Sequence, residues 1–170
     1  MRVSVFLDGA NFFYMQKDAL KQFIDPKKLL DYISSNFGEI QDAFYYMGQD
    51  ATPDNRQQGY LDALPYMGFS VITKQIKTVL NQESGQLRQK ANLDIEIVLD
   101  MFNTIDNYDM AVLISGDGDF DRALQLLRAR GKKFKVFSTE RCIARELIQT
   151  AGMHYLDFSK IIDQIKKESI

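Results

Sequence analysis

The sequence is poor in the residues and segments that several classes of protein require. It has one cysteine, Cys142, so the chain cannot form an internal disulfide, and a single free thiol is typical of a reducing compartment. Its one histidine, His154, is far along the chain from the acidic turns described below, so we do not expect a histidine general base. The apolar run near the N-terminus is interrupted by Asp8 and is too short for a signal peptide or a membrane span. We therefore expect a cytoplasmic protein that has no membrane partner.

Two nucleotide-binding motifs and an excess of positive charge are also missing. No Gly-x-Gly-x-x-Gly follows the first apolar run, and there is no phosphate loop with Gly-Lys-Ser/Thr. Lys and Arg number 21 against 23 Asp and Glu, which gives a net charge of -2. This balance argues against a constitutive DNA-binding protein but allows an enzyme with a local basic rim. The 170 residues have an ordinary globular composition, and we expect one domain, 1–170.

Short apolar runs alternate with segments of helical periodicity along the chain. A polar, turn-rich segment at 77–90 predicts a hairpin or flap. The alternation of the other segments predicts an α/β fold with a central, mainly parallel sheet of five or six strands and helices on both faces. The predicted strands are 3–7, 40–47, 69–76, 110–114, 133–137 and 154–156, and the predicted helices are 12–23, 26–37, 52–67, 92–105, 122–130, 142–151 and 159–167.

The strand at 110–114 ends abruptly in an acidic, glycine-rich turn. Asp117, Asp119 and Asp121 fall within five residues of this turn. Asp119 could simply cap the next helix, but a capping role does not explain Asp117. Asp8 directly follows the first strand. If the first and fourth strands are neighbours, these carboxylates meet at the switch point of the sheet, where ligands bind in such folds.

Asp94 adds a further carboxylate to this set. At about 100° per residue, it lies on the apolar face of the helix 92–105, in line with Val98 and Met101. A buried charge must be paired, protonated or bound to a metal. The alternatives are a carboxylate favoured by the helix dipole or one paired with Lys90. When Asp94 is considered together with Asp8 and Asp117, binding of a metal is the better interpretation of its carboxylate.

Several carboxylates without a partnering histidine or cysteine suit a hard cation that prefers oxygen ligands, Mg²⁺ or Mn²⁺. Such an ion polarises a phosphoryl oxygen and supplies a nucleophilic hydroxide, so the predicted chemistry is phosphodiester hydrolysis. Asn11, three residues after Asp8, could bond to a phosphate or to a metal-bound water. It could also be an ordinary helix cap.

Three motifs carry a resemblance to a known family. They are Asp8-Gly9-Ala10-Asn11, the pair Lys90 and Asp94, and Ser115-Gly116-Asp117-Gly118-Asp119-Phe120. In this order they resemble the NYN domain, and within it the LabA-like bacterial branch of the PIN-like nuclease group, over roughly residues 1 to 160. The resemblance implies a Rossmann-like PIN-type fold and an endoribonuclease dependent on Mg²⁺ or Mn²⁺. It also implies that Asp8, Asp94, Asp117 and Asp119 form the catalytic, metal-binding set, and that Asn11 and Ser115 support the metal or a phosphate.

RNA is the partner that this resemblance implies. Basic residues near the carboxyl edge of the sheet are candidates for contact with it, namely Arg88, Lys90, Arg141 and Arg145, and Tyr14, Tyr45 and Tyr46 could stack on bases if they are exposed. The basic residues could instead be solvated surface, and the tyrosines core. An RNA-binding or regulatory module that retains a cation site without catalysis is the alternative function, and a phosphohydrolase for a small nucleotide is a third. A homodimer is possible.

Overall fold

The fold is built on one six-stranded sheet in which every neighbouring pair of strands is parallel. The computed structural model describes residues 1–49, 53–90 and 92–169; the side chains of Val79 and of 87–90 are outside the description. In spatial order the strands are β3 (Ser70–Gln75), β2 (Glu39–Gln49), β1 (Arg2–Asp8), β6 (Met110–Ile114), β7 (Lys133–Ser138) and β8 (Tyr155–Asp157). The predicted α/β class and parallel sheet are confirmed, with six strands.

The strand order places the predicted switch point at the centre of the sheet. β1 pairs with β2 on one side and with β6 on the other, so the chain winds outward in opposite directions from the β1–β6 pair. Leu7 is level with Ile114, which means that Asp8 and Ser115 leave the sheet side by side. All five residues of β6 are buried because this strand is covered on both faces. The carboxyl ends of β1 and β6 therefore define one edge at which their polar residues meet.

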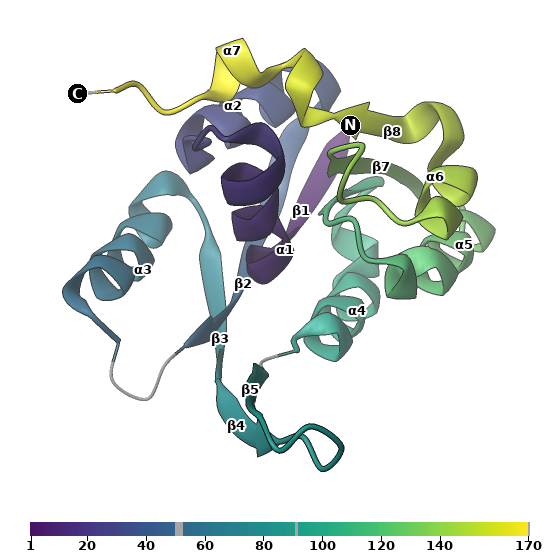
Figure 1. Cartoon of the computed structure of the whole chain (residues 1–170). Helices are drawn as coiled ribbons and strands as arrows, with labels where there is room; N and C mark the ends of the chain where they lie inside the picture. Colours follow the sequence, from purple (N-terminus) through teal and green to yellow (C-terminus); the bar gives the residue numbers. More distant parts are fainter. Residues whose placement is uncertain (50–52, 91, 170) are drawn as a thin grey trace.

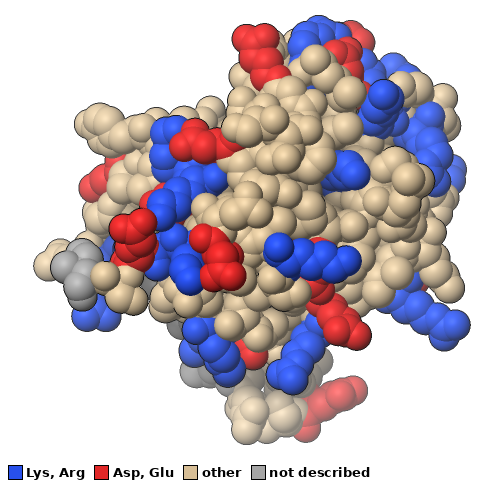
Figure 2. Space-filling view, turned by 90° about the horizontal axis from the view of Figure 1, so that it is seen from above, with Lys and Arg blue, Asp and Glu red and all other residues tan. Residues whose placement is uncertain are grey.

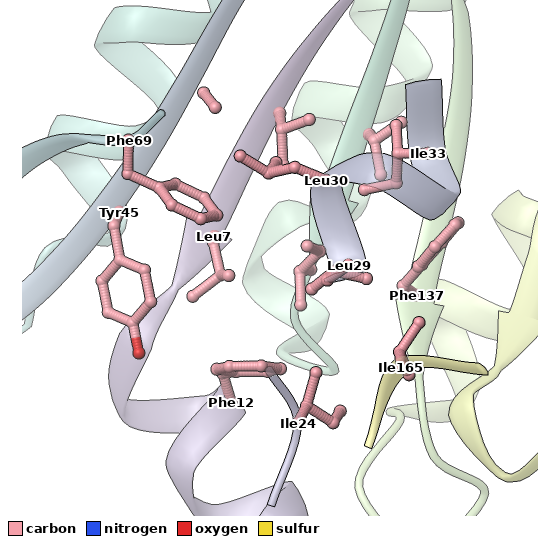
Figure 3. Close-up of a cluster of buried hydrophobic side chains, with 14 of the residues drawn as sticks. Leu7, Phe12, Ile24, Leu29, Leu30, Ile33, Tyr45, Phe69, Phe137 and Ile165 are labelled. Atoms are coloured by element: carbon pink, nitrogen blue, oxygen red, sulfur yellow. The ribbon is translucent and has the colours of Figure 1, made fainter. Parts of the chain in front are cut away.

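Helices cover both faces of the sheet (Figure 1). Alternate residues of β1 feed two separate cores, since Val5 and Leu7 pack on one face and Phe6 on the other. Figure 3 shows the first core, in which Phe12 and Leu29 approach Leu7 from the covering helices. The helices are α1 (Gly9–Tyr14), α2 (Pro26–Phe37), α3 (Asn55–Met67) and α7 (Ile162–Ile165) on that face, and α4 (Asp94–Asn103), α5 (Asp121–Ala129) and α6 (Arg145–Ala151) on the other.

The segment 77–90 forms the predicted hairpin. Its strands β4 (Lys77–Leu80) and β5 (Leu87–Lys90) pair antiparallel with each other and form a sheet of their own. The hairpin extends beyond the main sheet at the end where β1 leads into α1 (Figure 1). Its second strand leads back toward Asp94, the first residue of α4. No helix in the described ranges is long and apolar enough to cross a membrane.

Several helices are shorter than the periodicity predicts. The predicted helix 12–23 is α1 followed by a π-helical turn, Met15–Leu20, and it ends at Lys21 in the left-handed region. The predicted helix 142–151 begins only at Arg145. In the predicted helix 159–167, Asp157 rather than Ser159 caps a short 3₁₀ turn ahead of α7. Thr52, the predicted start of another helix, lies outside the described residues, and α3 is capped by Asp54.

Candidate metal centre

The first part of the site is the turn from β1 into α1. Asp8 is the N-cap of α1: its Oδ1 accepts from the backbone N–H of Asn11 at 3.4 Å. Gly9 is required directly after it, because a Cβ at this position would lie 2.3 Å from the carbonyl oxygen of Tyr46 in β2. The cap and the close approach fix the direction in which the Asp8 carboxylate leaves the sheet. Asn11 is therefore not the cap of this helix.

The second part is the turn after β6. The buried Ser115 hydroxyl donates to Asp8 Oδ2 at 2.8 Å and accepts from the N–H of Asp117 at 3.2 Å. Asn11 Oδ1 accepts from the N–H of Gly116 at 2.9 Å, so the start of α1 is bonded to this turn. A Cβ on Gly116 would lie 1.9 Å from the carbonyl oxygen of Cys142, which leaves no space for any side chain. These contacts hold the two turns in one rigid unit.

Asp117, not Asp119, caps the helical turn that follows. Its Oδ1 accepts from the N–H of Asp119 at 2.9 Å in a short 3₁₀ helix, Gly118–Phe120. Asp121, the third acidic residue of this turn, points elsewhere, because its carboxylate bonds to Gln125 and Thr150. The capping interpretation of Asp119 is therefore wrong, and Asp119 extends from the turn as an exposed carboxylate.

Asp94 reaches this turn from the first residue of α4. A carboxylate oxygen of Asp94, one of Asp117 and one of Asp119 all lie within 4.8 Å of one another. Asp94 and Asp117 are half-buried, and none of the three forms an ion pair with a side chain that the structure describes. Three carboxylates in one place, two of them half-buried, are costly unless a cation joins them. The donor set fits a hard divalent cation that keeps part of its water shell.

Asp8 lies next to this trio but not within it. Its two oxygens are occupied by Ser115 and by the first turn of α1. Burial raises its pKa above the usual value, the bonds from Ser115 and Asn11 oppose that rise, and the charge of Asp117 adds to it. Asp8 is thus a fourth carboxylate adjacent to the other three.

The electrostatics of Asp94 show how crowded these carboxylates are. Burial, followed by the charges of Asp117 and Asp8, raises the pKa of Asp94 to about 6 from an ordinary value of 3.8. The Asn92 side chain opposes the shift through a hydrogen bond. Strongly perturbed carboxylates of this kind concentrate at functional sites. The structure therefore brings Asp8, Asp94, Asp117 and Asp119 together with Asn11 and Ser115, as the sequence predicts.

The basic candidates are placed less uniformly. Arg141 and Arg145 are exposed, and they flank the segment whose Ala144 N–H donates to the Gly116 carbonyl at 2.8 Å. The side chains of Arg88 and Lys90 lie outside the described part of the structure, although their backbone forms β5.

Two of the three candidate tyrosines belong to the core. Tyr45 and Tyr46 are 2% and 1% exposed, and their hydroxyls bond to Tyr60 and to Asp100 of α4. Consecutive strand residues are both buried here because each face of β2 is covered. For Tyr45 and Tyr46 the structure therefore confirms the alternative of core packing and excludes stacking on bases, whereas Tyr14 is exposed.

Two further charged residues lie near the site, and one of them, Glu146, was not identified from the sequence. Lys74, in β3, forms an ion pair with Glu96 of α4 at 2.8 Å and so tethers the helix that carries Asp94. Glu146 of α6 places Oε2 3.5 Å from the point that a Cβ on Gly118 would occupy, which brings another carboxylate to the acidic turn. Glu146 could have been identified from the sequence, because it is an acidic residue at the start of the helix that follows the fifth predicted strand.

The fold and the site define an α/β protein with an acidic centre at the switch point of a parallel sheet. The sequence matches the NYN domain over residues 2–167, and the chain belongs to this family, part of the PIN-like nuclease group. It is 44% identical over 168 residues to the low amplitude and bright protein LabA of Synechococcus elongatus, an alignment that covers 98% of this chain and 88% of LabA. A crystal structure of VPA0982, a protein of unknown function from Vibrio parahaemolyticus, has the same fold, with a TM-score of 0.78 and 24% sequence identity. The superposition covers 98% of this chain and 96% of the VPA0982 chain.

Proposed function

We propose that the protein is an endoribonuclease that hydrolyses RNA phosphodiester bonds with Mg²⁺ or Mn²⁺. The observation that carries this proposal is the meeting of Asp94, Asp117 and Asp119 within 4.8 Å at the carboxyl ends of β1 and β6. Membership of the NYN family adds the class of reaction, because the family belongs to a group of nucleases. An acidic centre of this kind suits a phosphodiester substrate only if a cation offsets its negative charge.

Asp94, Asp117 and Asp119 would hold the cation, which when bound polarises a phosphoryl oxygen and neutralises charge in the transition state. Asp8 adds its charge from behind the trio, and we assign it to the same set because that charge raises the pKa of Asp94. Ser115 and Asn11 fix the two turns relative to each other through their bonds to Asp8, to the Asp117 N–H and to the Gly116 N–H. These two residues orient the carboxylates.

Basic residues on two neighbouring segments would contact the phosphates of the RNA. Arg141 and Arg145 flank the residues that pack on Gly116 and Gly118. Arg88 and Lys90 belong to β5, just before Asp94. A chain with a net charge of -2 needs such local positive charge to bind a polyanion next to an acidic centre.

The test is cleavage of a mixed-sequence single-stranded RNA in Mn²⁺, in Mg²⁺ and in EDTA. Asp117→Asn is compared with the wild type, because the amide retains the acceptor that caps the turn but removes the charge. Asp163→Asn is the matched control, an equal change of charge in α7 on an exposed side chain. We expect cleavage that requires metal, is lost in Asp117→Asn and is retained in Asp163→Asn.

Other outcomes would redirect the assignment. RNA that is bound but not cleaved by the wild type contradicts the nuclease and favours the regulatory RNA-binding module. Hydrolysis of model phosphoesters without cleavage of RNA favours a phosphohydrolase for small nucleotides. Equal cleavage by wild type and Asp117→Asn identifies a contaminating nuclease and removes support for the proposal.

A further inference from the structure

The start of α4 is held differently from the rest of the acidic centre. Asp117 and Asp119 lie in one turn, which the bond from the Asp117 N–H to the buried Ser115 hydroxyl helps to fix. Asp94 comes from another element, and Leu93, at the N-cap position of α4, forms no side-chain cap. Helix ends fray, and a missing cap leaves their first N–H groups unsatisfied. The position of Asp94 therefore needs support from elsewhere.

The course of the chain provides little of that support. Between β3 and α4 the chain leaves the main sheet, forms the hairpin of β4 and β5, and returns (Figure 1). The hairpin is a sheet of its own, separate from the six strands that carry the site. A connection of this kind joins β3 to α4 covalently without fixing how the first turn of α4 is oriented.

Lys74, near the end of β3, joins the two elements directly. Its Nζ donates to Glu96 Oε1 at 2.8 Å and to the Asn92 carbonyl oxygen at 3.4 Å. Ile72, two residues earlier, packs on the core beneath α4, so Lys74 points to the same face of the sheet. Within the described residues, these are the hydrogen bonds that connect the first turn of α4 to another element.

Glu96 depends on this contact. Its Oε2 is buried and has no hydrogen-bond partner among the residues that the structure describes, so Lys74 supplies the bond to its carboxylate. The same bond lowers the pKa of Glu96 and keeps it ionised. Without Lys74, the carboxylate would gain free energy by turning toward water. A turn of this kind would carry the start of the helix with it.

Glu96 and Asp94 lie on opposite sides of α4. They are two residues apart, which is about 200° around the helix axis. Asp94 reaches the acidic turn, and Glu96 reaches Lys74, so the ion pair fixes how the first turn is rotated about its axis. A rotation of about 20° would move a carboxylate that lies about 5 Å from the axis by about 2 Å. Distances from a metal to its ligands tolerate only about 0.2 Å.

We propose that Lys74 is a positioning residue that, through its ion pair with Glu96, holds Asp94 where it completes the metal centre. The proposal rests on the proposed function, because it concerns the cation site of the same centre. A lysine at this edge could act instead through its charge alone. The sign of the effect separates these roles: loss of a positive charge near carboxylates strengthens the binding of a cation, whereas loss of position weakens it.

The test is isothermal titration of the RNA-free protein with Mn²⁺ at pH 7.5. Lys74→Met removes the ion pair and retains an apolar stem, and Lys74→Arg retains a cation that can pair with Glu96. Lys77→Met is the matched control, because it removes the same charge from an exposed lysine of β4 that forms no ion pair with a described side chain. Thermal unfolding of each variant is measured in parallel.

We expect Lys74→Met to raise the Kd for Mn²⁺ about fivefold, less than the loss of a group bonded directly to a metal ligand, which costs 10- to 100-fold. Its Tm should fall by less than about 3 °C, since a partly exposed ion pair contributes little to global stability. Lys74→Arg should bind Mn²⁺ within about twofold of the wild type. Lys77→Met should bind it as tightly as the wild type or more tightly.

Four results would overturn the proposal. They are unchanged or tighter binding by Lys74→Met, equal weakening in Lys77→Met, equal weakening in Lys74→Arg, and weaker binding that accompanies a larger fall in Tm, which identifies a structural role. These results leave the ribonuclease intact, because wild-type cleavage is measured separately. Mn²⁺ binding that depends on Lys74 in a protein that never cleaves RNA would support the proposal and overturn the nuclease. A wild type that binds no Mn²⁺ overturns both.

Discussion

The two ends of the central strands carry the same type of residue in opposite electrostatic states. At the amino end, Arg2 of β1 forms an ion pair with Asp109 at 2.9 Å, and this lowers the pKa of Asp109 to about 2. At the carboxyl end, Asp94 lies among other carboxylates, and its pKa rises to about 6. Charges are neutralised in pairs at one end and left crowded at the other. The crowded end is the one that a cation would stabilise, and this supports the proposal that it is the functional edge.

The surface around the amino end carries mixed charge and so differs from the acidic edge. Seen from above, basic and acidic side chains are interspersed across the molecule (Figure 2). Lys132 bonds there to the Tyr108 carbonyl, and Lys132, Lys133 and Lys135 lie before or within β7, away from the carboxylates. Mixed charge of this kind keeps a protein soluble without creating a site. The acidic edge is distinguished by crowding of one sign.

The largest expected effect is the loss of cleavage when a carboxylate at the carboxyl end is neutralised, compared with neutralisation of one at the amino end. Asp94→Asn should lower metal-dependent cleavage about 10³-fold, because the cation contributes several kcal/mol to the transition state. Asp109→Asn should leave the rate within about twofold, since Asp109 lies at the far end of β6. Single-turnover cleavage assays with both variants decide this, and equal losses would abolish the distinction between the two ends.

Two glycines extend the comparison to the backbone. Gly116→Ala should destabilise the fold by about 3 kcal/mol, because its Cβ would collide with the Cys142 carbonyl. Gly131, before β7 at the amino end, has open space but a φ of 76°, so Gly131→Ala should cost about 1 kcal/mol. Urea denaturation measures both. A Gly116→Ala protein as stable as the wild type would show that the acidic turn is not held as rigidly as described.

The pH dependence of stability should separate the two ends by sign. The pKa of Asp94 is higher in the folded protein than its ordinary 3.8, so protonation favours the fold. In EDTA, the contribution of Asp94 should make the fold about 1 kcal/mol more stable at pH 5 than at pH 7.5. Denaturation of wild type and Asp94→Asn at the two pH values isolates this contribution as a difference. An identical pH dependence of the two proteins would contradict the crowding.

The smallest effect should come from the ion pair at the amino end. Because the pKa of Asp109 is lowered, its contribution is complete above pH 4 and is lost only as the pH falls through about 2. Asp109→Asn should therefore lower Tm slightly at pH 7.5, equally at pH 5, and less in high salt, since the pair is exposed and screened. A large loss of stability would mean that this pair matters more than the exposed geometry indicates. Differential scanning calorimetry resolves the shift.

Elements with local signals were predicted most accurately. The apolar run at β6 and the Asp25-Pro26 start with the Gly38 stop of α2 mark their own ends, and the structure has both at the predicted bounds. The π-helical turn after α1 could not be predicted, because it depends on the Gln16 side chain, which donates to the Phe12 carbonyl and accepts from the distant Ile24 N–H. Apolar spacing alone does not distinguish this turn from a continued α-helix.

The site divides in the same way. The carboxylates follow strand ends or sit on an apolar helix face, so Asp8, Asp94 and Asp117 could be proposed from pattern alone. The bonds that orient them join residues about a hundred positions apart, such as Ser115 and Asp8, and require the strand order of the sheet. Burial of Tyr45 and Tyr46 likewise depends on helices that cover both faces of β2. Tertiary neighbours, not local sequence, determine these features.

Binding of Mn²⁺ tests the central claim most directly, because it requires neither a known RNA nor turnover. Isothermal titration at pH 7.5 compares the wild type with Asp117→Asn and with Asp109→Asn, two equal changes of charge at opposite ends of the same strand. The account predicts that Mn²⁺ binds the wild type and Asp109→Asn alike, and binds Asp117→Asn at least about tenfold more weakly. Equal binding by all three proteins, or none by the wild type, would contradict the assignment of the acidic edge as a metal centre.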